Sequence, residues 1–222
     1  MWVVFMARTY NEYYLGWQEI NRIIACAKNL KERVILKILA RTGMRRFELA
    51  NLRVKDVDFD RKRIYISKGK GGTDEDPKSR IVPIDDDTLQ DIKFYLEGRR
   101  AGILIQSNKK AHDGISLSAI NRITEGAAER AGIRNPNPKL KHLNPHIFRH
   151  SFSRLSLMEG IPFNIVQKIV GHADARTTLQ MYGVPSINDA QHMYNEKLTM
   201  RFHQKVSLEE DNKLSKFTSD RS

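Results

Sequence analysis

The sequence has a single cysteine, no long apolar run and a shortage of acidic residues. Cys26 alone can build neither a disulfide framework nor a multi-cysteine metal site. No stretch approaches the ~20 apolar residues that a membrane-spanning helix needs, and the opening MWVVFM lacks the basic stretch and small-residue cleavage site of a signal peptide. The motifs GxGxxG and GxxxxGK[ST] are also absent, so nucleotide binding has no support.

What the sequence does have is a large excess of positive charge. Its 222 residues include 38 Lys and Arg against 26 Asp and Glu, which gives a formal net charge of +12. Hydrophobic residues make up 40% of the chain, enough for a folded core. We therefore expect a soluble intracellular protein with a polyanionic partner, which for a surplus of this size is most often nucleic acid.

Hydrophobic spacing predicts a mainly α-helical fold with a small three-stranded antiparallel sheet. No strand alternates with helices in the way that a parallel α/β sheet requires. The predicted helices span about 16–27, 31–41, 46–52, 85–98, 118–131, 145–159, 162–170, 176–182 and 186–201, and the predicted strands span 57–59, 63–67 and 80–84.

Positive charge is concentrated between residues 130 and 154, where six Arg or Lys residues occur with no Asp or Glu. A merely solvated surface normally mixes both signs, so contact with phosphates is the better interpretation. Few aromatic residues lie nearby, which favours duplex over single-stranded nucleic acid. The residues that we predict to contact DNA are Arg46, Lys70, Lys78, Arg80, Lys139, Lys141, His150 and Arg154.

Three short motifs carry side chains that suit phosphate chemistry, although each is a weak signal alone. In TGMRRFEL, a glycine turn delivers Arg45 to the start of a short helix, where its guanidinium can face an anion. In PHIFRH, His146 and Arg149 are three residues apart and share a helix face. In VGHADARTTLQMY, a Gly-His pair precedes Tyr182, which is either a core aromatic or, if it lies near these groups, a nucleophile.

Taken in order along the chain, these motifs resemble those of the tyrosine recombinase (phage integrase) family. The matching segments are TGMRRFEL, ISKGK ahead of RIVPI, HIFRHSF and VGHADARTTLQMY, within a region from about residue 16 to residue 194. The resemblance is greatest to Xer-like and to archaeal or viral integrases. It implies the catalytic-domain fold of that family and a site-specific DNA recombinase or integrase that cleaves and rejoins duplex DNA through a 3′-phosphotyrosyl intermediate, with no metal or other cofactor.

The resemblance also implies roles for residues of the first and third segments. Arg45 resembles the first catalytic arginine and Arg149 the second, with His146 as the partner of Arg149. Glu48 matches an acidic residue that supports the site without reacting. The two arginines would hold the scissile phosphate.

The remaining roles fall on residues of the other two segments. Lys68 resembles the lysine that protonates the departing 5′-oxygen, although Lys70 is a second candidate for that role. His172 resembles the histidine of the Leu-Gly-His motif, with Val170 in place of leucine. Tyr182 resembles the nucleophile.

The expected organisation is one catalytic domain over 16–200, after an N-terminal segment of 1–15 and before a polar tail of 201–222. Family members usually carry a separate core-binding domain ahead of this region, and we expect it to be absent. Such a chain would form a half-clamp with weaker and less specific DNA binding. The helix from Ser186 would pack on its own core or dock on a neighbouring copy in a dimer or tetramer on DNA.

Two other functions are compatible with these motifs. One is relaxation of supercoiled DNA without recombination, as in type IB topoisomerases, and the other is DNA binding without catalysis. In each case we expect the protein to act on DNA in the cytoplasm, as a nucleoid-associated protein or as the product of a virus or plasmid.

Overall fold

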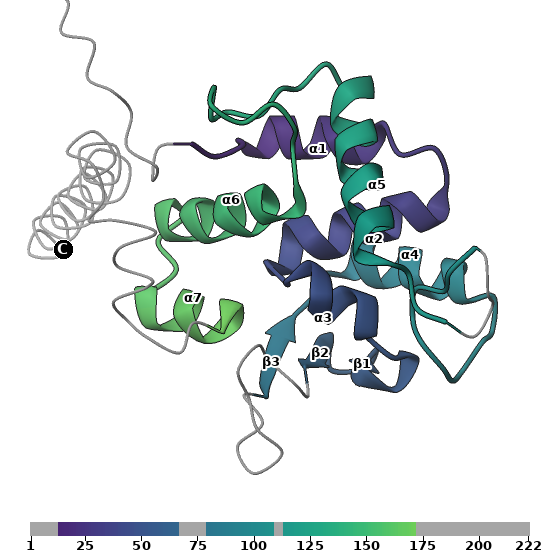
Figure 1. Ribbon diagram of the computed structural model, residues 1–222. Coiled ribbons are helices and arrows are strands. Elements are labelled where there is room, and N and C mark those ends of the chain that lie inside the picture. The colour runs from purple at the N-terminus through teal and green to yellow at the C-terminus, as the bar shows by residue number, and fades with distance from the viewer. Residues whose placement is uncertain (1–12, 67–78, 109–112, 172–222) are drawn as a thin grey trace, which may run out of the picture. The chain divides into compact units, whose positions relative to one another are not determined.

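Two helices, α2 (Leu30–Thr42) and α6 (Pro145–Met158), form the centre of the fold. The computed structural model describes residues 13–66, 79–108 and 113–171 (Figure 1). Helix α2 is buried at every position from Val34 to Ala40, so the middle of this helix has no solvent face. A helix that is covered all round must lie inside a domain.

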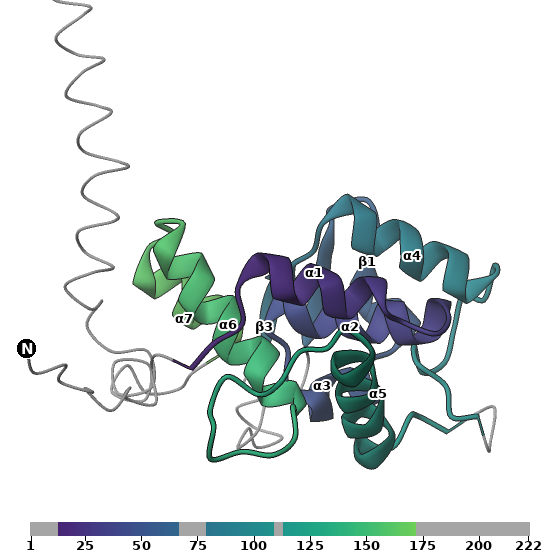
Figure 2. The same cartoon turned by 90° about the horizontal axis from the view of Figure 1, so that it is seen from above.

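The remaining elements surround this centre. The helices are α1 (Trp17–Ala25), α3 (Arg46–Asn51), α4 (Asp86–Leu96), α5 (Leu117–Arg130) and α7 (Phe163–Val170), with a 3-10 turn at Val54–Asp56. The strands are β1 (Val57–Asp58), β2 (Arg63–Ile66) and β3 (Arg80–Pro83). Helix α2 packs against α1, α4 and α6, and Figures 1 and 2 both show α4 and α7 on opposite sides of it.

The three strands form one antiparallel sheet in the order β1–β2–β3. Ile64 pairs with Val57 and with Val82, and Ile66 pairs with Arg80. The side chains alternate, with Ile64, Ile66 and Val82 in the core and Tyr65 exposed on the other face. Helix α7 packs against β3, so the outer strand of this sheet lies beside that helix.

Local sequence signals account for where the helices begin and end. Asn29, Asp85 and Ser116 each accept a hydrogen bond from a backbone N–H of the helix that follows them. Gly43 and Gly171 end α2 and α7 in the left-handed conformation that glycine adopts most readily.

The predicted fold class is confirmed by this arrangement. All predicted helices and strands within the described ranges are present, with ends that differ by one or two residues. The 3-10 turn at Val54–Asp56 was not predicted. The predicted helices over 176–182 and 186–201 lie outside the described residues. No helix in the described part of the chain is long and apolar enough to cross a membrane.

Candidate active site

The turn between α2 and α3 places Arg45 at the start of α3. Gly43 has a φ of +63°, and a Cβ atom there would lie only 2.6 Å from a ring carbon of Phe152. Glycine is therefore required both by the backbone and by the close approach of α6. Arg45 is the N-cap residue of α3, and its side chain is 22% exposed.

Glu48 holds Arg45 in place from one turn further along α3. The backbone N–H of Arg45 donates to Glu48 Oε2 at 2.8 Å, and Arg45 Nη1 donates to Glu48 Oε1 at 3.1 Å. Arg45 Nη2 donates to the carbonyl oxygen of Gly171 at 2.9 Å, at the end of α7. The guanidinium is thus fixed from two sides.

The first two turns of α6 carry the other two predicted catalytic residues that the structure describes. Asn144 caps this helix by accepting a hydrogen bond from the backbone N–H of His146 at 3.0 Å, and Pro145 occupies the first helical position. His146 is exposed. Arg149 follows one turn later; it is 5% exposed and donates from Nη1 to the carbonyl oxygen of Gly43 at 2.7 Å.

Arg45, His146 and Arg149 line one small hollow together with Met44, Arg46 and Pro145. Arginines from α3 and α6 therefore line one hollow beside the first turn of α6, where backbone N–H groups add positive potential. Such a group favours an anion, and arginine is well matched to the oxygens of a phosphate. Lys68, His172 and Tyr182, the other predicted catalytic residues, lie outside the described residues.

A buried ion pair lies behind this hollow. Arg80 donates from Nη1 and Nη2 to the two carboxylate oxygens of Glu48, both at 2.7 Å. The side chain of Glu48 is 1% exposed and that of Arg80 is 6% exposed. Burial by itself would raise the pKa of Glu48, but hydrogen bonds from Arg80 and then from Arg45 outweigh it and hold that pKa below its usual value.

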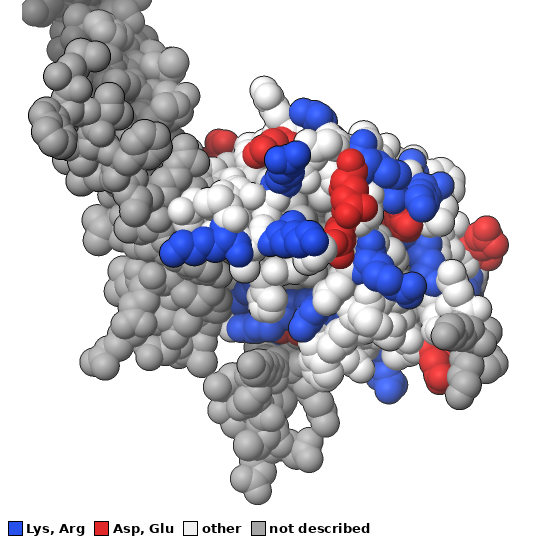
Figure 3. Space-filling model, turned by 45° about the horizontal axis from the view of Figure 1, so that its top comes forward, with Lys and Arg blue, Asp and Glu red and all other residues white. Residues whose placement is uncertain are grey.

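The residues predicted to contact DNA fall into two groups. Lys139 and Lys141 are exposed on the loop before α6, and Arg46 is half-buried and donates to Asn121 Oδ1 at 2.8 Å. Basic side chains lie on both sides of a band of acidic ones on the face shown in Figure 3. Lys70 and Lys78 lie outside the described residues.

The second group is buried. Besides Arg80, it contains His150 and Arg154, which are 6% and 5% exposed on α6. Burial, with a smaller effect from the nearby charge of Arg154, lowers the pKa of His150 to about 4. The guanidinium carbon of Arg154 lies 5.9 Å from the centre of the Tyr14 ring, a cation–π contact with the segment that leads into α1.

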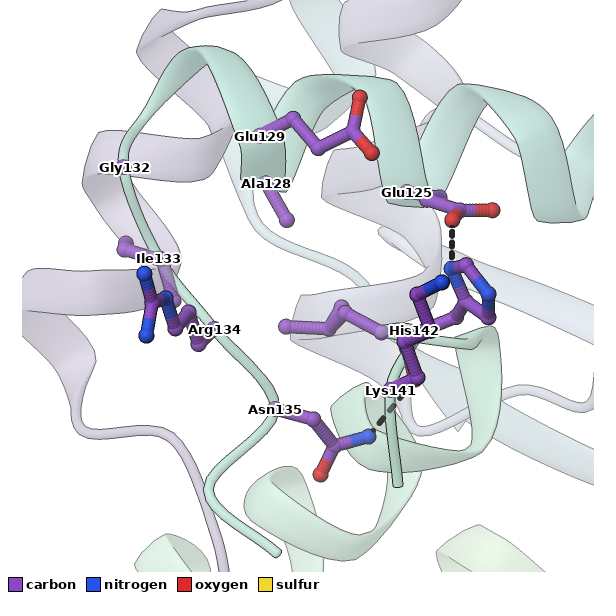
Figure 4. Close-up of a pocket in the computed structure, with 10 residues that line it drawn as sticks. Glu125, Ala128, Glu129, Gly132, Ile133, Arg134, Asn135, Lys141 and His142 are labelled. Carbon is purple, nitrogen blue, oxygen red and sulfur yellow. Dashed lines mark hydrogen bonds and ion pairs between the residues drawn. The ribbon is translucent and has the colours of Figure 1, made fainter. Parts of the chain in front are cut away.

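A separate cavity of about 350 Å³ lies between α5 and the loop before α6 (Figure 4). A contact between Glu125 and His142 closes one side of it, and Asn135 Nδ2 donates to the carbonyl oxygen of His142 at 2.8 Å. Two acidic residues, Glu125 and Glu129, line the cavity beside Arg134 and Lys141. These contacts fix the shape of the loop that carries the exposed lysines.

Comparison with known families assigns the chain to one of them. Residues 14–186 match the model of the phage integrase family. The chain belongs to this family. The integrase match includes Arg45, His146 and Arg149, the three residues that meet in the hollow, and it also includes the segment around Tyr182.

Curated relatives of this integrase-family chain include archaeal recombinases. It is 30% identical over 167 residues to tyrosine recombinase XerA of Pyrococcus horikoshii and 32% identical over 170 residues to that of Pyrococcus furiosus. Each match covers 74% of this chain and 54% of the relative. The chain therefore spans about half the length of the curated relatives that it matches.

Solved recombinase structures share the fold. A crystal structure of XerA recombinase matches with a TM-score of 0.70 and 29% identity, over 86% of this chain and 65% of that one. The XerH site-specific recombinase bound to its difH substrate, in a pre-cleavage complex, matches with a TM-score of 0.64 and 23% identity, over 82% of this chain and 53% of that one. The second likeness concerns the fold alone.

Two features of this integrase-family site were missed in the sequence. One is the contact of Arg80 with Glu48, and the other is the pair of α7 carbonyl groups that accept from Arg45 and Arg80. A partial signal was present, because Glu48 is an acidic residue beside two arginines in TGMRRFEL and Arg80 begins a strand of only four residues. Nothing in the sequence linked the two segments.

Proposed function

We propose that this chain cleaves and rejoins duplex DNA as a tyrosine recombinase, through a covalent 3′-phosphotyrosyl intermediate. The observation that carries the proposal is the hollow in which Arg45, His146 and Arg149 come together. Membership of the phage integrase family supports it, and so does the match to XerA recombinases at about 30% identity.

In the proposed reaction, Arg45 and Arg149 bind the scissile phosphate and stabilise the charge that builds on its oxygens in the transition state. Both guanidinium groups are held by backbone carbonyls, so little reorganisation is needed when DNA binds. His146, exposed at the N-terminus of α6, donates a hydrogen bond to the same phosphate, and His172 adds another.

Tyr182 then attacks the phosphorus. A phenol has an ordinary pKa near 10 and is a poor nucleophile at neutral pH, so the two guanidinium groups have to favour its phenolate form. The phenol loses its proton to solvent water as the new P–O bond forms, and the bond from phosphorus to the 5′-oxygen breaks. Lys68 gives a proton to that oxygen as general acid. Attack by a 5′-hydroxyl on the phosphotyrosine reverses the step and reseals a strand.

The first experiment is covalent trapping on a nicked duplex whose 5′-hydroxyl fragment is lost after cleavage. The wild-type chain should form a protein–DNA adduct, and Tyr182→Phe should form none. Tyr95→Phe is the matched control, since Tyr95 is half-buried on α4 and receives only a long 3.4 Å hydrogen bond from the Gln106 N–H. An adduct that persists in Tyr182→Phe would overturn the assignment, and strict dependence on Mg²⁺ would count against the mechanism.

We also propose that the chain assembles as a dimer or tetramer on DNA through the helix predicted from Ser186. Truncation after Gly183 should weaken self-association on DNA, and unchanged assembly would refute this.

Analysis of the DNA products distinguishes recombination from the related relaxation reaction. Recombinant products support the proposal, whereas relaxation of supercoiled plasmid without them would favour an enzyme of the topoisomerase type.

A further inference from the structure

Arg80 connects three parts of the fold through one side chain. It pairs with Ile66 across the β2–β3 ladder. Besides its two bonds to Glu48, it donates from Nε to the carbonyl oxygen of Ile169 at 2.8 Å. All three nitrogens of the guanidinium are therefore used, and the side chain is 6% exposed. A guanidinium in this setting is poorly placed to reach a DNA phosphate.

The carboxylate that Arg80 binds is shared with Arg45. Arg80 makes two bonds of 2.7 Å to Glu48, whereas the side chain of Arg45 makes one of 3.1 Å. Since Arg80 occupies both carboxylate oxygens, Glu48 does not draw the Arg45 guanidinium fully onto itself. An arginine has five N–H donors, and the described contacts of the Arg45 side chain take two of them. N–H donors of Arg45, a residue that lines the hollow, therefore remain for another partner.

The same two arginines hold the end of α7. Arg80 binds the carbonyl oxygen of Ile169 and Arg45 binds that of Gly171. The last carbonyls of a helix lack partners within the helix and carry its negative end, so both contacts are favourable. Gly171 also leaves room for Arg80, because a Cβ atom at that position would lie 2.7 Å from Arg80 Cδ.

We infer that Arg80 is a positioning residue for phosphate binding: through Glu48 and the end of α7 it sets the orientation in which Arg45 presents its free N–H groups to the hollow. The inference rests on the proposed function. Arg80 itself touches no substrate. Its loss leaves Arg45 as the one arginine that binds the buried Glu48 carboxylate among the described residues, and the Arg45 guanidinium turns toward that carboxylate and away from the phosphate.

The test compares Arg80→Met and Arg80→Lys with matched changes at Arg63 in the full chain. Arg63 lies on the paired strand and makes a single 3.2 Å ion pair with Asp58, at 27% and 21% side-chain exposure, outside the contacts described above. The rate of adduct formation is measured at saturating nicked duplex, well below the melting temperature. A misplaced catalytic group costs on the order of 100-fold in rate, which we expect for Arg80→Met. Arg63→Met should stay within about twofold, as expected of a surface ion pair away from the site.

Arg80→Lys separates geometry from charge. Lysine keeps the positive charge next to Glu48 but lacks the planar fork that binds both oxygens. We expect the melting temperature to recover most of the way to wild type while the rate stays low. A rate that Arg80→Lys restores in full would overturn the inference, and so would a full rate in Arg80→Met.

Two further measurements exclude other roles. If Arg80 acts through Arg45, the two residues are coupled, and the effect of one change depends on the other in a double-mutant cycle. Arg80→Met should then lower the rate by less than about threefold when it is made in an Arg45→Lys background. An undiminished 100-fold loss in that background would overturn the inference. The second measurement is the slope of log K for DNA binding against log salt concentration. If Arg80→Met lowers that slope by about one and keeps its full rate at saturating DNA, Arg80 is a DNA contact and the inference is wrong.

Binding of inorganic phosphate gives a readout that needs no cleavage. We expect Arg80→Met to weaken phosphate binding about tenfold, the loss of roughly one hydrogen bond to a charged group, and Arg63→Met to leave it unchanged. Equal phosphate affinity in wild type and Arg80→Met would overturn the inference. A wild-type chain that binds phosphate but forms no adduct would overturn the proposed function instead, and one that binds no phosphate would overturn both.

Discussion

Arg149 donates a hydrogen bond to the carbonyl oxygen of Gly43 at 2.7 Å, which joins two segments 106 residues apart in the sequence. The acceptor is a backbone atom, so any residue at position 43 could supply it, but only glycine fits the turn and the contact with Phe152. The glycine of TGMRRFEL thus serves the arginine of HIFRH as well as Arg45. The two motifs are therefore joined directly in the fold.

Gly171→Ala should cost more stability than Gly102→Ala, although both glycines have a positive φ, of 69° and 88°. The backbone strain of about 1–2 kcal/mol is common to the two changes. A Cβ atom at Gly102 meets nothing within 4 Å, whereas one at Gly171 meets Arg80, which three hydrogen bonds hold in place. We expect about 1–3 kcal/mol of additional loss at Gly171, measured by urea unfolding.

Removing Arg80 provides the check on that prediction. In an Arg80→Ala background the additional cost of Gly171→Ala should largely disappear, because the atoms that the new methyl group meets are gone. If Gly171→Ala and Gly102→Ala lose the same stability in the otherwise wild-type chain, the predicted clash between a methyl group at Gly171 and Arg80 is contradicted.

Asp91→Asn should be strongly destabilising, because it leaves a buried lysine short of a partner. Lys37, with a side chain 7% exposed, lies 2.6 Å from Asp91, which is 8% exposed, and 2.8 Å from Asp87, which is 61% exposed. Breaking a buried pair from one side costs about 3 kcal/mol. Asp86→Asn, which breaks an exposed pair with Lys62, should cost under about 1 kcal/mol. Equal melting temperatures in the two variants would show that the α2–α4 ion pairs contribute little.

Much of the fold could be predicted because its signals are local. Helix α5 was predicted over 118–131 and spans 117–130, since Ser116 caps its start and Gly132 follows its end with a positive φ. Alternating residues such as Ile64, Tyr65 and Ile66 predict a half-buried strand, which is the burial pattern that β2 has. The turn at Val54–Asp56 is only one turn long, and it is held by Asp56, whose side chain accepts from the Arg53 N–H, together with a backbone hydrogen bond that the Val54 N–H donates to the carbonyl oxygen of the distant Gly102.

Which of the basic residues are buried could not be predicted, because burial depends on distant partners. Arg80 and Lys141 look alike in the sequence, yet one is inside the fold and the other is exposed. The difference comes from Glu48, which lies 32 residues before Arg80 and provides a buried carboxylate. The predicted roles of Arg45, His146 and Arg149 stay predictions, but their meeting in one hollow is the arrangement that those roles require.

The chain should lose stability as the pH falls from about 6.5 to 4, and His150 should be responsible. Its pKa in the folded state is about 4, below the ordinary value of 6.5, because the imidazole is buried. The unfolded chain therefore binds a proton in this range that the folded chain does not, so the stabilisation is present above pH 6.5 and is lost on acidification. Between pH 7 and 4.5 the expected loss is about 2.5 kcal/mol.

His150→Gln should flatten this part of the stability profile, measured by urea unfolding at several pH values. His142→Gln is the control, because that histidine is 61% exposed and pairs with Glu125 at the surface. Carboxylates whose pKa is lowered, such as Asp91, lose their contribution only as the pH falls below about 5, so the slope between pH 7 and 5 reports the histidine. An unchanged slope in His150→Gln would assign the effect to another group.

Lys139 and Lys141 should contribute to DNA binding through phosphate contacts alone. Both are exposed on the loop before α6, and each contact with a duplex phosphate adds about 0.9 to the slope of log K against log salt concentration. Alanine at both positions should lower that slope by about two and weaken binding to unrelated duplexes equally. Lys93→Ala, on the exposed side of α4, should leave the slope unchanged.

Arg154→Met should also leave the salt dependence of DNA binding unchanged, because the Arg154 side chain is buried over Tyr14. The effect of this change should appear as a lower melting temperature. A slope that falls in Arg154→Met but not in the double lysine variant would place the DNA on a different face of the protein.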